Sequence, residues 1–349
     1  MKTPAANAPV STAPAPERIL QLSWGTAVTR CLASAVELGL FTHVAQGRST
    51  ARELASAAGS SPRGTEMVAN TLVALGLMIV TGEGRERRYA LAPDAEAFLV
   101  RDKPAYLGDF VLFHAQLLDE HWKELTKSVR TGRPGTAVDR PEQGVPLWHR
   151  LVDALFPLNY AAASALGKEI ARLHRGPEIR VLDVAAGSGV WGIGAAQADP
   201  RVRVVAQDLS DSLEHARRWV QRTGLDGRVE YLEGDLRQVD LGEKEFDAVL
   251  LGHICHSEGA EHTRKLLLKS ARALKPGGTI AIAEFLADES RDGPPQALLF
   301  ALNMLVHTTE GDTFTVPELR AWLAAAGFRD VRTMEAPAPS PLVLATLGP

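Results

Sequence analysis

Three acidic residues each follow a short apolar run in the second half of the chain. Asp183 lies in LDVAAGSGVWG, Asp208 ends VRVVAQD, and Asp235 follows RVEYLEG. The first of these segments also contains Gly187-x-Gly189-x-x-Gly192, a spacing shared with dinucleotide-binding loops. Asp183 would repel a pyrophosphate and attract an ammonium group, so the loop favours a cationic ligand over a dinucleotide.

The spacing of the acids suits an amino-acid nucleoside. Asp208 can accept hydrogen bonds from both hydroxyls of a ribose. Asp235 can accept one from an adenine amine, and Leu236 can lie against the ring. The pattern therefore predicts S-adenosylmethionine as the cofactor, although such acids could instead only cap the helices that follow. The further residues expected to contact the cofactor are Leu209, Gly234, Gly252 and His253.

An alternation of strands and helices must position these residues. From about residue 176, apolar runs that end in Gly or Asp alternate with helical patterns such as SDSLEHARRWVQRTG and TRKLLLKSARAL. This rhythm predicts an α/β domain over 176–349: a Rossmann-like, doubly wound, mainly parallel sheet. Ligands bind such sheets at the carboxyl ends of the strands, where the three acids lie.

The first half of the chain is predicted to be mostly helical. Residues 1–16 are rich in Pro and Ala and are expected to form a disordered tail. Over 17–103, one long helix from Ile19 to Leu40, two shorter helices and a hairpin in LMIVTGEGRERRYALAP predict a winged-helix-like domain. Over 104–175, two longer helices are expected near 104–131 and 146–173. Within the α/β domain described above, KPGG is predicted to be a turn and TIAIAEFLAD a strand.

Composition and charge exclude several classes of partner. The chain has 349 residues, 45% of them hydrophobic, with 38 Lys+Arg and 42 Asp+Glu. Residues 1–100 carry nine Lys+Arg against eight Asp+Glu, which leaves no electrostatic footprint for a nucleic acid. No apolar stretch reaches the ~18 residues of a membrane span. Since Cys31 and Cys255 cannot form a disulfide framework, a reducing, cytoplasmic location is expected.

The sequence resembles the class I S-adenosylmethionine-dependent O-methyltransferases of the bacterial polyketide and plant phenolic type. The resemblance covers nearly all of the chain after the tail and is carried by ELGLFTHVAQGRSTARELA, FLVRDKPAYLGDF, LKPGG and FALNMLVHTTEGDTFTVPELRAWLAAAGF. It implies a homodimer built through the winged-helix-like domain and a small-molecule methyl acceptor. Two departures are Ala186, where the family often has a glycine, and Thr313, where the plant pattern has a second acid.

The same resemblance assigns roles near the reaction centre. His256, in LLGHICHSEGAEH, matches the family's general base, and Glu284 matches an acid that orients it. The family's substrate walls come from the helix before the sheet and from the segment after its fifth strand. In this chain those walls correspond to Phe156, Asn159 and Tyr160, and to Leu302, Asn303, Met304 and His307.

Two other functions stay open at this stage. His253, His256, His262 and His307 could ligate iron or zinc, as in metal-using relatives that methylate the carbon next to a 2-oxo acid. The chain could also bind the cofactor without methylating, as a sensor or as an enzyme of other chemistry.

Overall fold

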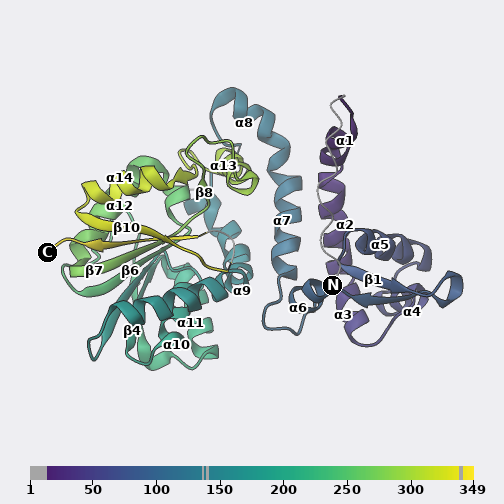
Figure 1. Cartoon of the computed structure of the whole chain (residues 1–349), viewed down its shortest axis with the longest axis horizontal. Coiled ribbons are helices and arrows are strands. Elements are labelled where there is room, and N and C mark those ends of the chain that lie inside the picture. The colour runs from purple at the N-terminus through teal and green to yellow at the C-terminus, as the bar shows by residue number, and fades with distance from the viewer. Residues whose placement is uncertain (1–13, 136, 139–140, 338–340) are drawn as a thin grey trace. The chain divides into compact units, whose positions relative to one another are not determined.

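The computed structural model describes residues 14–135, 137–138, 141–337 and 341–349 (Figure 1). Most of the tail expected to be disordered therefore lies outside the described residues. The chain divides into two compact units between Ala115 and Gln116, within helix α7 (Gly108–Glu120). The domain boundaries expected at 103 and 175 stay predictions.

The N-terminal unit has the helices and the hairpin of a winged helix. Its elements are α1 (Glu17–Ser23), α2 (Gly25–Glu37), α3 (Leu40–Ala45), α4 (Ala51–Ala58), α5 (Pro62–Ala74), β1 (Met78–Thr81), η1 (Gly84–Glu86), β2 (Arg88–Leu91), α6 (Pro93–Phe98) and the first part of α7. β1 and β2 pair antiparallel. The single helix expected from Ile19 to Leu40 is instead broken at Trp24, and Gly39, in the left-handed region at φ 64°, separates α2 from α3.

Three α-helices precede the sheet of the second unit. The second of the expected long helices is α9 (Pro141–Leu173). The helix expected near 104–131 is α7 and α8 (Leu125–Thr131), separated by the 3₁₀ turn η2 (Trp122–Glu124).

The second unit is built on a seven-stranded sheet. Its elements run β3 (Ile179–Val184), α10 (Val190–Ala198), β4 (Val202–Asp208), α11 (Ser210–Arg222), η3 (Asp226–Arg228), β5 (Val229–Glu233), β6 (Phe246–Gly252), α12 (Cys255–Ala273), β7 (Leu274–Ala283), β8 (Leu286–Ala287), α13 (Pro295–His307), β9 (Phe314–Thr315), α14 (Val316–Ala325), β10 (Phe328–Met334) and β11 (Leu342–Leu347). The order in the sheet is β10-β11-β7-β6-β3-β4-β5. β3 to β7 are parallel and β10 and β11 antiparallel, which confirms the predicted fold.

Helices cover both faces of this sheet (Figure 1). One core joins α9, α10 and α11 to one face, and a second core joins α12 and α14 to the other. The central strands are therefore buried on both sides, which explains their continuous apolar runs. Two local predictions were wrong: KPGG lies within β7, and the strand through TIAIAEFLAD ends at Ala283, so that Glu284 follows it.

The parallel register brings the functional loops together. Asp183 at the end of β3 pairs with Ala206 of β4, and Asp208 at the end of β4 pairs with Glu233 of β5. The carboxyl ends of these strands therefore meet at one edge of the sheet. Among the described helices, none is long and apolar enough to cross a membrane.

Candidate active site

The loop after β3 is shaped by a buried carboxylate. Asp183 has no exposed surface, and its Oδ2 accepts a hydrogen bond of 2.8 Å from the Gly192 N–H. Burial raises the pKa of Asp183 to about 7. A Cβ on Gly192 would lie 2.6 Å from Val204 Cγ1, so only glycine lets the helix come this close to the strand. Asp183 thus braces the loop from beneath.

Asp208 and Gln207 tie the neighbouring loops together at the end of β4. Asp208 accepts hydrogen bonds from the Gly187 N–H (2.8 Å) and the Leu209 N–H (2.7 Å), and burial raises its pKa. Gln207 accepts from the Ala185 N–H (3.3 Å) and donates to the Gly234 carbonyl (2.7 Å). The loops after β3, β4 and β5 are therefore cross-linked beside one another.

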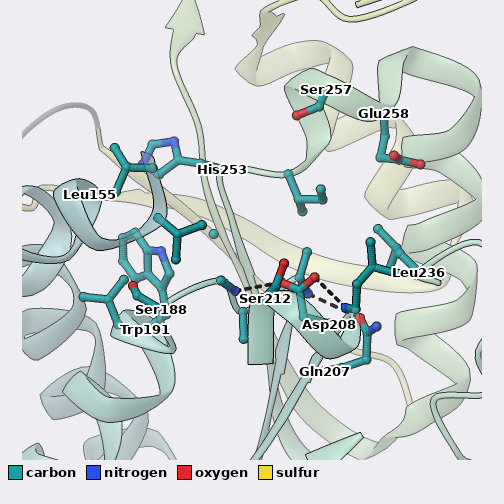
Figure 2. A pocket seen from close by; sticks show the side chains of 18 of the residues that line it. Leu155, Ser188, Trp191, Gln207, Asp208, Ser212, Leu236, His253, Ser257 and Glu258 are labelled. Atoms are coloured by element: carbon teal, nitrogen blue, oxygen red, sulfur yellow. Dashed lines mark hydrogen bonds between the residues drawn. The ribbon is translucent and has the colours of Figure 1, made fainter. Parts of the chain in front are cut away.

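These loops surround a cavity of about 330 Å³ (Figure 2). Nine of the residues expected at the site line it: Asn159, Gly187, Asp208, Leu209, Gly234, Asp235, Leu236, Gly252 and His253. Asp183 and Gly189 stand behind the first loop instead. The sequence reasoning missed Val152, Leu155, Ser188, Trp191, Gln207, Ser212, Arg237, Ser257, Glu258 and Thr308, which also line the cavity.

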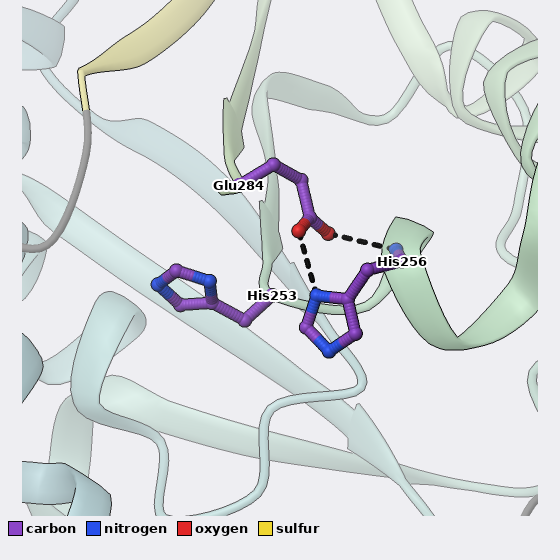
Figure 3. A group of neighbouring side chains, drawn as sticks. All are labelled: His253, His256 and Glu284. Atoms are coloured by element: carbon purple, nitrogen blue, oxygen red, sulfur yellow. Dashed lines mark hydrogen bonds and ion pairs between the residues drawn. The ribbon is translucent and has the colours of Figure 1, made fainter. Parts of the chain in front are cut away.

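His256 and Glu284 form a buried pair (Figure 3), and the neighbouring His253 lines the cavity. The His256 Nδ1 lies 2.6 Å from Glu284 Oε2, and the His256 backbone N–H donates to Glu284 Oε1 over 3.1 Å. The two side chains are 7% and 1% exposed. Burial alone would raise the pKa of Glu284, but its contacts with His256 hold the pKa below its ordinary value. Glu284 is therefore a carboxylate, and His256 Nδ1 must carry the proton between them.

His253 lies between the cavity and this pair. Its backbone has φ 59°, in the left-handed region, and its N–H donates to the Ala283 carbonyl over 2.9 Å. The ring centroid lies 6.0 Å from that of Trp191 and 6.1 Å from that of His256. Although the residue is half-buried, burial of the ring lowers its pKa to about 4. His253 is thus a neutral side chain that lines the cavity.

The histidines do not assemble the four-ligand set considered from the sequence. His262 Nδ1 lies 3.9 Å from Glu310 Oε2, and the ring centroid of His307 lies 4.8 Å from that of His121, with the two rings tilted by 48°. The donor atoms that do come together belong to His253, His256 and Glu284, within 4.8 Å of one another. Within this group, the 2.6 Å between His256 and Glu284 is the length of a charge-assisted hydrogen bond.

Of the expected substrate walls, Asn159 alone reaches the cavity. The ring of Phe156 stacks on that of Trp219, with centroids 3.7 Å apart, and the Tyr160 hydroxyl donates to Gln197 over 2.6 Å. Both side chains therefore contact other residues and do not line the cavity. Met304 and His307 are buried on α13 without lining it. Phe156 and Tyr160 therefore do not line this cavity, and their expected role as walls of the substrate site stays a prediction.

Comparison with known proteins identifies the family. A model of the O-methyltransferase domain matches residues 167–329, and a model of the O-methyltransferase dimerisation domain matches residues 20–101. The 3-hydroxy-5-methyl-1-naphthoate 3-O-methyltransferase of Streptomyces sahachiroi is 31% identical over 93% of this chain and 92% of its own. This chain belongs to the O-methyltransferase family.

A further relative supports the family assignment, and a solved structure shares the fold. The tetracenomycin polyketide synthesis 8-O-methyl transferase TcmO of Streptomyces glaucescens is 30% identical over 94% of this chain and 96% of its own. The structure of human N-acetylserotonin methyltransferase, in complex with S-adenosylmethionine, has the same fold, with a TM-score of 0.82 and 24% identity over 97% of this chain and 99% of that one.

The methyltransferase uses S-adenosylmethionine as its cofactor, and the cavity fits that molecule. Gly187 and Gly234 have positive φ (55° and 153°) and let a ligand approach their backbone. Asp208 uses each carboxylate oxygen for one backbone N–H, which leaves further lone pairs for hydroxyl donors.

Proposed function

We propose that this methyltransferase transfers a methyl group to a hydroxyl of a small aromatic or polyketide molecule, with His256 as the general base. The observation that carries the proposal is the His256–Glu284 pair. Because Glu284 holds the ring proton on Nδ1, the neutral imidazole of His256 has its lone pair on Nε2. That lone pair can take the proton of an acceptor hydroxyl.

The acceptor class follows from this base and from the relatives. A phenol has a pKa of about 10, so at neutral pH it needs a base to become a nucleophile. Among the relatives at 30% identity or above, two are named for a naphthoate and for tetracenomycin polyketide synthesis and one for acetylserotonin, while a fourth is the N,N-dimethyltransferase OxyT. When bound, S-adenosylmethionine supplies the methyl group on a positively charged sulfur.

The cofactor would be held by the three strand ends. Asp208 would bind the ribose hydroxyls, and Asp235 and Leu236 would receive the adenine. The backbone of Gly187 and Ser188 would lie along the cofactor. Asn159 and His253, both neutral, would face the side from which the acceptor enters. This placement is supported by the fact that these residues line one cavity.

The N-terminal unit is proposed to join two copies of the chain. Ile19 and Leu22 in α1 and Trp24 directly after it are large apolar side chains that are 71%, 66% and 66% exposed. A surface of this kind is costly in water unless a partner covers it. The match to the dimerisation domain spans the same segment, which favours a homodimer.

The His256→Ala variant tests the role of the base. At pH 7 its methylation rate should fall by ~10²–10⁴-fold, the usual contribution of a positioned base. The difference in rate from the unchanged protein should shrink as the pH approaches the pKa of the acceptor phenol. The affinity for S-adenosylhomocysteine should be retained. His262→Ala is the matched control, because His262 lies on the same helix, away from the cavity lining.

A second candidate, metal-dependent methylation of a carbon, is favoured only by the convergence of His253, His256 and Glu284. It predicts bound iron or zinc in protein purified without a histidine tag, and an activity of His256→Ala that stays lost at every pH. A normal rate for His256→Ala at pH 7 would show that His256 takes no part in the reaction. Cofactor binding would then remain, but both the general-base and the metal-dependent mechanisms through His256 would be wrong.

A further inference from the structure

An ion pair joins two walls of the cavity at the β5 end. Arg237 belongs to the loop after β5, and Glu258 belongs to the first turn of α12. Arg237 Nε donates to Glu258 Oε2 over 3.0 Å, and Nη2 donates to Oε1 over 3.4 Å. This two-pronged geometry fixes the plane of the guanidinium. Both residues line the cavity.

The environment of the pair distinguishes it from an ordinary surface salt bridge. The Glu258 side chain is 13% exposed and that of Arg237 is 44% exposed. A carboxylate this far removed from water needs its cation, because an unpaired buried charge is costly. The guanidinium that it holds is flat and weakly hydrated, which is the kind of surface on which an aromatic ring stacks.

The loop itself does not depend on this pair for its position. Lys269 Nζ donates to the Leu236 carbonyl over 2.8 Å, and the Arg237 N–H donates to Asp235 Oδ1 over 2.8 Å. In Figure 2, Leu236 and Glu258 lie on one side of the cavity, and Trp191 and His253 lie on the other. The ion pair therefore adds a contact between walls that are already in place.

We propose that Arg237 and Glu258 form a clasp at the nucleobase end of the cavity, which retains the adenine of the cofactor and must part for the cofactor to exchange. The inference rests on the proposed placement of adenine beside Asp235 and Leu236. Glu258 acts as the positioning residue, and Arg237 makes the contact. The clasp sets the rate at which the cofactor leaves and has no part in the proton transfer by His256.

The dissociation rate of S-adenosylhomocysteine, followed by stopped-flow displacement, tests the clasp. Arg237→Met and Glu258→Gln should each release it about tenfold faster, the effect of losing one hydrogen bond to a charged group. The double variant should be no faster than the single variants, because both break the same pair. Arg237→Lys, which keeps the charge but not the fork, should lie between Arg237→Met and the unchanged protein.

The Glu261–Lys265 pair offers a matched control. It lies on the same helix, and its side chains are 67% and 64% exposed. Glu261→Gln should leave the dissociation rate unchanged. Raising the salt concentration should speed release from the unchanged protein and from Glu261→Gln, but not from the variants without the clasp, since salt screens a partly exposed ion pair.

Two results would overturn the clasp: unchanged dissociation in both single variants, or effects that add in the double variant. Leu236→Ala separates this failure from a failure of the adenine placement. If Leu236→Ala weakens S-adenosylhomocysteine binding while the clasp variants do not, the placement stands and the clasp is wrong. If Leu236→Ala is also without effect, both are wrong. Melting temperatures within a few degrees of the unchanged protein establish that each variant is folded.

Discussion

Glu284 accepts two hydrogen bonds from the same residue, one from the backbone N–H of His256 and one from its Nδ1. The two donors use different carboxylate oxygens. The carboxylate therefore fixes both the position of the first turn of α12 and the proton on the imidazole ring. A side chain with only one acceptor oxygen cannot do both.

Glu284→Gln tests this double role. The amide oxygen can accept from the backbone N–H, but the NH₂ group then faces Nδ1 as a donor and drives the ring proton to Nε2. A base with its proton on Nε2 cannot accept another from the substrate, so the methylation rate at pH 7 should fall by ~10²–10⁴-fold, as for loss of the base itself. Steady-state rates and the melting temperature are measured together; a normal rate in a folded variant contradicts the role of Glu284.

Asp208→Ala should weaken the binding of S-adenosylhomocysteine in calorimetry. Loss of hydrogen bonds from ribose hydroxyls to a carboxylate costs roughly 1.5–3 kcal/mol. Asp211→Ala is the control, since Asp211 lies three residues after Asp208, in the first turn of α11, but is 66% exposed and does not line the cavity. Unchanged affinity in Asp208→Ala would refute the ribose assignment.

Asp183 predicts a pH-dependent stability. Burial raises its pKa in the folded state to about 7, well above that of an exposed aspartate, so the folded state binds the proton more tightly than the unfolded state does. The free energy of unfolding should therefore fall as the pH rises from about 4 to 7. Asp183→Asn, which can still accept from the Gly192 N–H, should lose this slope. Urea unfolding at several pH values measures this slope. If the free energies of unfolding of the two proteins changed with pH in parallel, the prediction would be wrong.

Trp24→Glu should separate the dimer. A charge on the exposed apolar face of the N-terminal helices would be buried unpaired in the interface. Light scattering should then give a mass near 37.5 kDa, whereas the unchanged protein should have about twice that mass. Leu268→Glu, at a residue that is 56% exposed on α12, should not affect the mass. A monomeric unchanged protein at micromolar concentration rules out the proposed assembly.

The sheet and its strand ends could be predicted because they follow from short-range patterns. Apolar runs that end in Asp183, Asp208 and Asp235 mark both the strands and the edge where they meet. The pairing of His256 with Glu284 was expected from family resemblance alone, because the two residues are 28 positions apart and no local pattern joins them.

The walls of the cavity were harder to predict because they depend on helix phase. Val152, Leu155 and Asn159 share one face of α9 and line the cavity, whereas Phe156 lies on the adjacent face and stacks on Trp219. Both faces are buried, so hydrophobicity does not distinguish them. The sequence does contain one signal for Gln207, an amide near the end of the apolar run VRVVAQD. The structure buries this amide completely, and a buried amide needs hydrogen-bond partners in the adjoining loops.

Helix α12 is interrupted at Gly259, which has φ 70° and ψ 175°. A Cβ there would lie 2.5 Å from the Glu310 carbonyl oxygen, and the Asp312 N–H donates to the His256 carbonyl over 2.9 Å. The turn that carries His256 is therefore supported by the segment after α13 as well as by its own helix. Local opening of that segment would expose the amides around His256 to hydrogen exchange while the rest of α12 stays protected, which would place His256 in a different cooperative unit from most of the helix that bears it.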